Sequence, residues 1–432
     1  MSSCSRRSLV CVASFVLAFI LVPAPLRAAG FALFEQGGKG MGFAGAFTAQ
    51  ASDPSAIFHN PAGIAFLRRK QIYLGGTAVM PTWEFAGASP FPGEGVTERD
   101  AVKVLLPPAA YYTQPFSDRI AFGVGVNVPF GLTTEWADAD RFSGRYISRK
   151  ATLGGFAVNP TLAIKLADRL AVGAGLDLRF STVTLERRLP VINPFTQMPV
   201  DAADERLHGG TDLGIGFNAG VLAKLSDELS VGASYRHRVK VDYVGTASFT
   251  PVPTGNAQLD ARVLAGLPAQ NLSLDSSITF PAFFSGGVAY RRGDWVFEAD
   301  VNWYQWSSFQ TIPVNFAERP DLSGAITENY RDSFQYRFGA ERTLNDTWTV
   351  RGGYFWDETP APPETISPLL PDADRNGFCL GGTWKSGSWR VDAASWFVLA
   401  SDRSTGGLSR DSYDGTYKSR AFTLGVFVGY VF

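Results

Sequence analysis

Cysteine, histidine and charged residues are all scarce in this sequence, and each shortage excludes a class of protein. Two of the three cysteines, Cys4 and Cys11, lie in the first 28 residues, which leaves Cys379 unpaired and excludes a disulfide framework. The three histidines, at positions 59, 208 and 237, lack the spaced partners that a metal site or a catalytic triad requires. Charged residues make up 18% of the chain and the formal net charge is −1, which argues against a nucleic-acid partner. We therefore expect neither an enzyme nor a metal site.

A cofactor is not expected either. Residues 40–45 match a dinucleotide-binding fingerprint by letters, but they follow no strand, so the structural context that the motif needs is missing.

Long apolar runs are missing everywhere except near the start of the chain. Arg6 and Arg7, the apolar residues 9–22 and the prolines that follow them predict a signal peptide over residues 1–28. No later stretch contains 18 uninterrupted apolar residues, so no transmembrane helix is predicted. An exported chain in which 45% of residues are hydrophobic still needs a place for its apolar side chains.

Apolar and polar residues alternate with a period of two in many segments, and this alternation places the apolar side chains on one face of a sheet. In residues 295–303, Trp295, Phe297 and Trp303 share one face, and Glu298 and Asp300 lie on the other. Such a pattern predicts a sheet with one apolar and one polar face, as in a soluble sandwich or a membrane barrel. We expect strands near residues 70–81, 100–115, 119–130, 150–166, 169–186, 211–225, 229–248, 278–291, 294–307, 331–343, 347–357, 377–386, 387–400 and 418–432.

The lengths of the connections favour the membrane barrel. Every second connection is a tight polar turn, as at residues 117–118 and 293–294, and the other connections are long. Short turns at one end and long loops at the other, with an even strand number, are typical of outer-membrane barrels. Trp295, Trp303, Trp348, Trp356 and Trp389 lie near strand ends, where an interfacial girdle is expected. The fold class is therefore an all-β membrane protein, a 14-stranded antiparallel transmembrane β-barrel over residues 70–432.

Residues 30–67 do not fit the strand pattern. They are rich in glycine and alanine, so they bury little side-chain surface and cost much entropy to order. Such a segment needs a rigid wall around it, and we interpret residues 29–69 as an N-terminal hatch that plugs the barrel. At the other end of the chain, the last strand alternates up to Phe432, which predicts docking on the barrel-assembly machinery.

Several motifs, in order along the chain, resemble the FadL family of outer-membrane transporters for long-chain fatty acids and other hydrophobic compounds. The matching segments are residues 29–31, 53–63, 130–132, 159–160, 235–236, 300–303, 306–309, 353–354, 357–360 and 370–375. The resemblance implies capture of a hydrophobic ligand in a groove between outer loops, passage to an inner pocket, and lateral exit at an inward kink of the third strand.

The resemblance places a gate and an exit on particular residues. The hatch gate matches Asp53, Phe58, Asn60, Pro61, Ala62 and Gly63. The lateral exit matches Val128, Pro129, Phe130 and Gly131. Pro129 removes a donor from the strand ladder and so suits a break in the wall, but it could equally end the strand before a loop.

Two further groups of residues are candidates for contact with the ligand. Apolar residues of two long loops would form the capture groove, or would only pack the loops together; they are Leu189, Ile192, Phe195, Val263, Leu264 and Leu267. Among the polar residues of the lumen, Arg179, Arg236 and Arg238 would meet a carboxylate head group, or would only balance acids such as Glu298 and Asp300 in a polar network.

These features predict a monomer in the outer membrane of a Gram-negative bacterium, in contact with outer-membrane lipid and a hydrophobic small molecule. The expected cargo is a long-chain fatty acid first and an aromatic hydrocarbon second. The alternatives are a general diffusion porin, which needs an open lumen, and an outer-membrane lipase, which needs a Ser–His pair in the wall.

Overall fold

A computed structural model describes residues 30–102 and 104–432, and the predicted signal peptide lies outside this range. Fourteen antiparallel strands form a closed barrel, in which the first strand pairs with the last from Gln71↔Val431 to Gly87↔Gly415. In order around the barrel, the strands are β1 (Gln71–Gly87), β3 (Pro108–Pro115), β4 (Ile120–Asn127), β6 (Lys150–Ala167), β7 (Leu170–Ile192), β9 (Gly214–Lys224), β10 (Leu229–Arg236), β13 (Phe283–Arg292), β14 (Trp295–Tyr304), β17 (Ser333–Thr343), β18 (Trp348–Asp357), β19 (Arg375–Ser386), β20 (Trp389–Ala400) and β22 (Gly415–Val431).

The predicted faces of the strands are confirmed over most of the wall. On β14, Glu298 and Asp300 are 3% and 2% exposed, whereas Phe297 on the opposite face is 46% exposed. On β22, Leu424 and Val426 are 44% and 46% exposed. The outer face is therefore apolar and the inner face polar, as a membrane barrel requires.

Aromatic side chains form belts at both ends of the wall. Trp295, Trp348 and Trp389 begin β14, β18 and β20, next to the short turns. At the other end of β14, Trp303 stacks on Phe284 with ring centroids 5.5 Å apart. These positions agree with interfacial girdles at the two membrane surfaces.

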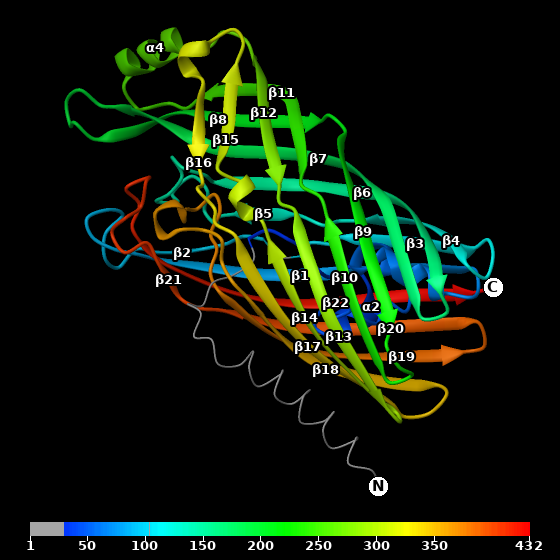
Figure 1. The fold of residues 1–432 in the computed structure, drawn as a ribbon. Coiled ribbons are helices and arrows are strands. Elements are labelled where there is room, and N and C mark those ends of the chain that lie inside the picture. The colour runs from blue at the N-terminus through cyan, green and yellow to red at the C-terminus, as the bar shows by residue number, and fades with distance from the viewer. Residues whose placement is uncertain (1–29, 103) are drawn as a thin grey trace.

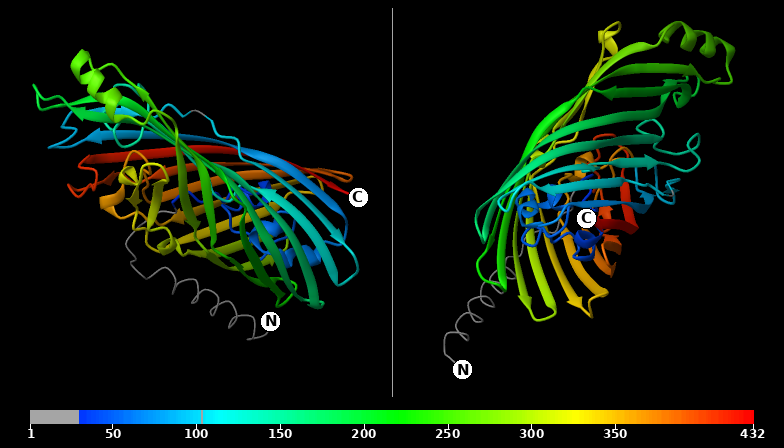
Figure 2. Two further views of the ribbon diagram at one scale, coloured as in Figure 1. Left: turned by 90° about the horizontal axis from the view of Figure 1, so that it is seen from above. Right: turned by 90° about the vertical axis from the view of Figure 1, so that its right-hand side faces the viewer.

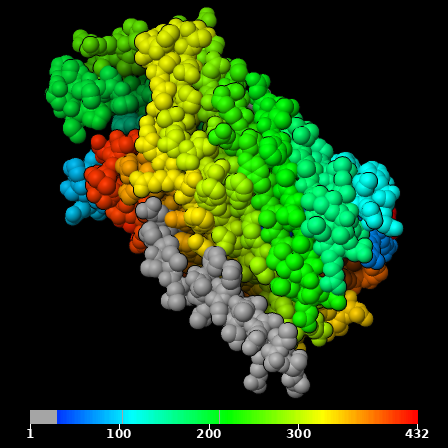
Figure 3. Space-filling view, in the orientation of Figure 1, coloured from blue at the N-terminus to red at the C-terminus, as the bar shows by residue number. Residues whose placement is uncertain are grey.

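Three of the long connections contain more regular structure than the sequence predicted. They extend the sheet beyond the barrel and bear one helix, the green and yellow part at the top of Figures 1 and 3. The elements of this projecting sheet are the end of β7 together with β8 (Pro199–Thr211), β11 (Val239–Pro251), α4 (Ala257–Gly266), β12 (Leu272–Phe280), β15 (Thr311–Phe316) and β16 (Gly324–Thr327). The segment predicted as loop 187–210 is thus mostly a hairpin of β7 and β8, whereas the short helix predicted within residues 249–277 is confirmed as α4.

Smaller elements complete the connections. They are β2 (Thr97–Arg99), β5 (Leu132–Glu135), η2 (Trp306–Ser308), η3 (Pro320–Leu322), η4 (Pro363–Thr365) and β21 (Arg403–Ser404).

No helix within the described residues is long and apolar enough to cross a membrane.

The N-terminal segment, residues 30–69, which we call the plug, lies within the ring of strands in both views of Figure 2. It contains three short helical turns, α2 (Gly38–Gly42), α3 (Ala56–His59) and η1 (Pro61–Phe66). Side chains from different sides of the barrel donate hydrogen bonds to its carbonyl groups: Trp396 to Met41 at 2.7 Å, Asn218 to Ile57 at 2.9 Å and Tyr111 to Gln36 at 2.7 Å. Since a buried carbonyl needs a partner, these hydrogen bonds from the wall add to those that the glycine-rich segment makes within itself.

Candidate functional site

Asn60 of the predicted gate links the plug to the barrel wall through its side-chain amide. Its Nδ2 donates to the carbonyl of Thr48 at 2.8 Å and to that of Val221 in β9 at 3.0 Å. Its Oδ1 accepts from the N–H of Ala62 and caps η1, with Pro61 at the first helical position. One amide therefore joins two parts of the plug to the barrel wall.

The other residues of the predicted gate lie close by and are buried. Asp53 is fully buried, accepts hydrogen bonds from the N–H and hydroxyl groups of Ser55, and forms an ion pair with Arg390 of β20 at 3.3 Å. The ring of Phe58 lies 5.1 Å from the guanidinium of Arg236. A Cβ atom at Gly63 would lie 2.2 Å from the carbonyl oxygen of Ala51, so this turn packs closely enough to require glycine.

The predicted exit lies at a break in the wall. β4 pairs with β6 as far as Asn127↔Ala157, and pairing with β6 resumes only at Leu132↔Leu153 in β5. The four residues 128–131 pair instead with the start of the plug. The N–H of Leu33 donates to the carbonyl of Pro129 at 2.9 Å, and the N–H of Gly131 donates to the carbonyl of Phe31 at 3.1 Å. Pro129 therefore lies in the gap between β4 and β5, both of which pair with β6.

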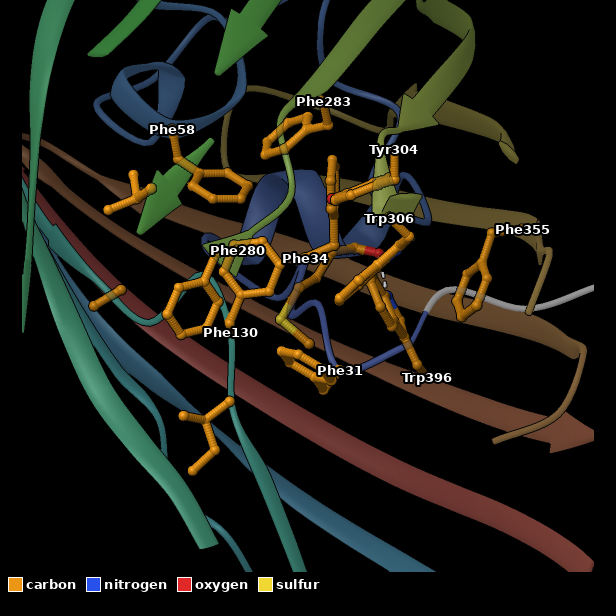
Figure 4. Close-up of a cluster of buried hydrophobic side chains, with 14 of the residues drawn as sticks. Phe31, Phe34, Phe58, Phe130, Phe280, Phe283, Tyr304, Trp306, Phe355 and Trp396 are labelled. Atoms are coloured by element: carbon orange, nitrogen blue, oxygen red, sulfur yellow. Dashed lines mark hydrogen bonds between the residues drawn. The ribbon is translucent and has the colours of Figure 1, made fainter. Parts of the chain in front are cut away.

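An apolar cavity of about 90 Å³ lies beside this break. Its lining includes Phe31 from the plug, Leu153 from β6, Ile278 from β12, Ile312 from β15 and Leu370 from the connection between β18 and β19. In Figure 4, Phe31 lies near Phe130 and Phe280 in an aromatic cluster, with ring centroids 6.1 and 6.3 Å from the Phe31 ring. Phe31 thus belongs both to the cavity lining and to the plug segment that pairs with residues 128–131 at the break in the wall.

Four of the five predicted lumen residues face the interior. Arg179 and Arg236 are 3% and 2% exposed, and both bind one carboxylate, that of Asp177, at 2.7 and 2.9 Å. Glu298 and Asp300 are also buried, and both bind the backbone of the plug. These contacts link charged groups to one another and to the plug, which agrees with the balanced-network interpretation.

Arg238 is the exception, and its predicted lumen position is wrong. β10 ends at Arg236 and β11 begins at Val239, so two residues lie outside the ladder. After this interruption the inward face is reversed, because Val239 and Val241 are buried while Arg238 and Lys240 are exposed. An uninterrupted period of two cannot anticipate such a reversal.

The six predicted capture residues lie on the projecting sheet and helix. Phe195, Leu264 and Ile192 are 77%, 60% and 55% exposed, and Leu189, Val263 and Leu267 are partly buried. None of the six lines the apolar cavity as the described residues define it. Their role in capture stays a prediction.

Burial shifts the pKa of groups that hold the plug and the loops in place. His59 lies 5.4 Å from Phe47 and 5.1 Å from Phe58 by ring centroids, and burial lowers its pKa to about 3. Burial also lowers the pKa of Lys39 to about 8, although Glu341 lies 3.7 Å away. Asp372, in the connection between β18 and β19, accepts from the N–H of Gly30 at 3.2 Å, and burial raises its pKa.

Sequence reasoning missed most of the cavity lining. Phe31, Ile278, Phe309 and Leu370 come from four separate parts of the chain, and only the fold brings them together. The motif segments around residues 29–31, 306–309 and 370–375 contain three of them, and this was the available signal. Among the described residues, no group of three or more His, Cys, Asp or Glu is placed to hold a metal ion.

Comparison with known proteins decides the family. The model of the family described as outer membrane protein transport protein (OMPP1/FadL/TodX) matches residues 20–432. The chain belongs to this family. Its members are transport channels of the outer membrane rather than enzymes, which agrees with the predicted fold and location.

The relatives and solved structures that the chain resembles carry different names. It is 27% identical to a 47 kDa outer membrane protein of Pasteurella multocida, over 85% of this chain and 86% of that protein. It is 24% identical to a long-chain fatty acid transport protein of Escherichia coli O6:H1, over 99% and 100%. The structure of a Pseudomonas aeruginosa FadL homologue matches with a TM-score of 0.82 at 22% identity, covering 93% of this chain and 99% of that one. The P. putida toluene transporter TodX matches with a TM-score of 0.75 at 20% identity, with the same coverage.

Proposed function

We propose that this protein carries hydrophobic molecules across the outer membrane, from the projecting sheet through the apolar cavity and sideways into the bilayer at residues 128–131. The observation that supports this route is the replacement of wall pairing by pairing with the plug: Pro129 and Gly131 bond to Leu33 and Phe31 instead of to β6. A plug segment can withdraw from the wall, whereas a continuous ladder cannot. The break is therefore the part of the wall that a movement of the plug would open.

A sideways exit suits apolar cargo. Releasing such a molecule into water would forfeit about 0.8 kcal/mol for each buried CH₂ group. Passage from the cavity directly into the membrane avoids most of that loss. Phe31 lines the cavity, and its carbonyl also accepts a hydrogen bond from the N–H of Gly131. A ligand in the cavity would therefore touch the segment that closes the proposed exit.

The names of the relatives support two kinds of cargo, long-chain fatty acids and toluene. The general diffusion porin is less well supported, because residues 37–65 are packed inside the barrel and nearly all of them are buried. Docking of Phe432 on the assembly machinery, contact with outer-membrane lipid and the monomeric state stay predictions.

A reversible crosslink tests the route. Ala32 and Phe130 are antiparallel bridge partners, and paired residues of this kind have Cα atoms about 4.5–5.5 Å apart, within disulfide range. In the variant Ala32→Cys/Phe130→Cys, oxidation should abolish uptake of a labelled hydrophobe and reduction should restore it. The single variant Ala32→Cys controls for the oxidant, and Cys379 is 3% exposed and so shielded. Undiminished uptake by protein shown to be crosslinked by mass spectrometry would place the exit elsewhere.

A further inference from the structure

We propose that the apolar cavity selects uncharged hydrophobic molecules, so that its ligands are hydrocarbons or neutral esters rather than ionised fatty acids. This inference rests on the proposed function, because it concerns the cavity on that route. The first observation is the lining itself. Of 18 lining residues, none is charged and only Thr152, Thr184 and Ser276 carry a polar side chain.

The three hydroxyl groups offer little to an anion. Thr184 is already paired, since its Oγ1 lies 2.9 Å from Nδ1 of His208. Thr152 and Ser276 are left with one O–H donor each. A carboxylate has two oxygens and about four acceptor positions, all of which are hydrated in water. Two neutral donors cannot replace that hydration.

The buried cation near the cavity is separated from it by two aromatic rings. The guanidinium carbon of Arg179 lies 5.0 Å from the centroid of Phe130 and 4.9 Å from that of Phe280. These two rings lie 5.0 Å apart, and both contact Phe31, the plug residue that lines the cavity. Arg179 itself is 3% exposed and does not belong to the lining.

Arg179 shares the carboxylate of Asp177 with Arg236, and its Nη2 lies 2.7 Å from that carboxylate. Its Nε and Nη1 are buried without a hydrogen-bond partner among the described residues, and the rings of Phe130 and Phe280 cover the guanidinium. A ligand carboxylate could reach this cation only by displacing Phe130 or Phe280 from it. Both rings are almost fully buried, at 5% and 1% exposure, and they form part of the central cluster in Figure 4.

The balance of interactions then favours neutral ligands. An apolar molecule gains free energy in proportion to the surface that it buries against Leu153, Ile278 and the other lining residues. An ionised carboxylate in the same place loses its hydration and finds no counter-charge, which outweighs the gain from its chain. A matched pair of ligands with one chain length therefore isolates the effect.

Competition between laurate and methyl laurate for the protein in nanodiscs tests the inference. The reporter is the neutral fluorophore N-phenyl-1-naphthylamine, and the pH is 7.5. We expect methyl laurate to displace the fluorophore at a concentration at least tenfold lower than laurate. Equal potency, or greater potency of laurate, would overturn the inference and leave the proposed route intact.

A charge placed in the cavity provides the second measurement. Ile326 of β16 lines the cavity and is only partly buried, so Ile326→Lys should be tolerated. This variant should raise the potency of laurate relative to methyl laurate at least tenfold, whereas Ile326→Met should keep the wild-type ratio. An unchanged ratio in Ile326→Lys would count against the inference. If neither ligand displaces the fluorophore from the wild type, the cavity is not a ligand site, and the proposed route fails together with the inference.

Discussion

The carboxylate of Asp300 in β14 accepts a hydrogen bond from the main-chain N–H of Thr48 at 2.9 Å, joining residues 252 positions apart. The same Oδ2 accepts from Phe47 at 2.8 Å. Two residues earlier in β14, Glu298 accepts from Ala49 at 2.6 Å and from Gln50 at 3.3 Å. Four consecutive N–H groups of the plug, those of residues 47–50, therefore bind the two acids.

Replacing both acids by amides should loosen the plug. The variant Glu298→Gln/Asp300→Asn keeps the side-chain sizes, but each side chain then has one acceptor oxygen instead of two and an NH2 group that cannot accept from the N–H groups of the plug. We expect a steady ion conductance in planar bilayers well above that of the wild type. Asp242→Asn is the matched control, because Asp242 is an exposed acid on β11. If the ion conductance of the double variant equalled that of the control, other contacts would be sufficient to hold the plug.

The barrel wall and the plug pack so closely at Gly232 that a larger side chain there should disturb both. A Cβ atom at Gly232 of β10 would lie 2.2 Å from the carbonyl oxygen of Thr48, whereas a Cβ atom at Gly286 of β13 would meet nothing within 4 Å. Gly232→Ala should therefore displace the plug and destabilise the protein by about 1–3 kcal/mol, the usual cost of overpacking. Thermal unfolding and conductance should change little in Gly286→Ala. Equal behaviour of the two alanine variants would contradict close contact at Gly232.

The barrel wall could be predicted from sequence because the alternation of apolar and polar residues that defines it is a local pattern. Each strand obeys one alternation over about ten residues, so Glu298, Asp300 and Phe297 could be assigned to faces without knowledge of the fold. The same rule fails where a strand is interrupted. The two residues between β10 and β11 reverse the inward face, and Arg238 therefore lies outside.

The cavity could not be predicted in the same way, because no local rule brings its lining together. Phe31, Ile278 and Leu370 are far apart in sequence, and their meeting depends on where the plug lies and how β12 extends beyond the barrel. Similarly, an alternating pattern shows that Glu298 faces inward but not that it binds the N–H of Ala49. Contacts between the plug and the wall follow from the three-dimensional fit of two separately encoded parts.

Asn60 allows a test of the gate with one substitution. Asn60→Ala removes the cap of η1, at about 1 kcal/mol, and leaves the carbonyls of Thr48 and Val221 without this donor. We expect a lower unfolding temperature and altered uptake of a hydrophobe. Asn376→Ala is a suitable control, since Asn376 lies in the wall at β19 and its side chain accepts a hydrogen bond from the hydroxyl of Tyr354, away from the plug. Unaltered uptake in Asn60→Ala would remove this residue from the gate.

The burial of His59 predicts that acid loosens the plug. Neither ring nitrogen has a hydrogen-bond partner, the ring packs against Phe34, Phe47 and Phe58, and the nearby charges that oppose its protonation are Arg337 and Arg236. Its pKa is about 3 in the seated plug, against 6.5 for a free side chain. The released plug therefore binds more protons than the packed plug between these pH values. The free energy that favours the packed plug is at its maximum above pH 6.5 and decreases as the pH falls toward 3.

At pH 5 this effect amounts to about 2 kcal/mol. We expect ion leakage through the wild-type protein to rise between pH 6.5 and pH 4, and His59→Leu to abolish that rise. Burial raises the pKa of Glu35 in the plug, which acts in the opposite sense, so the comparison with His59→Leu is needed to isolate the histidine. His208→Leu should keep the wild-type profile, because His208 is exposed on β8. A wild-type protein whose leakage is constant over this range would show that His59 stays neutral and seated, or that protonation does not release the plug, and either result would exclude acid-driven opening.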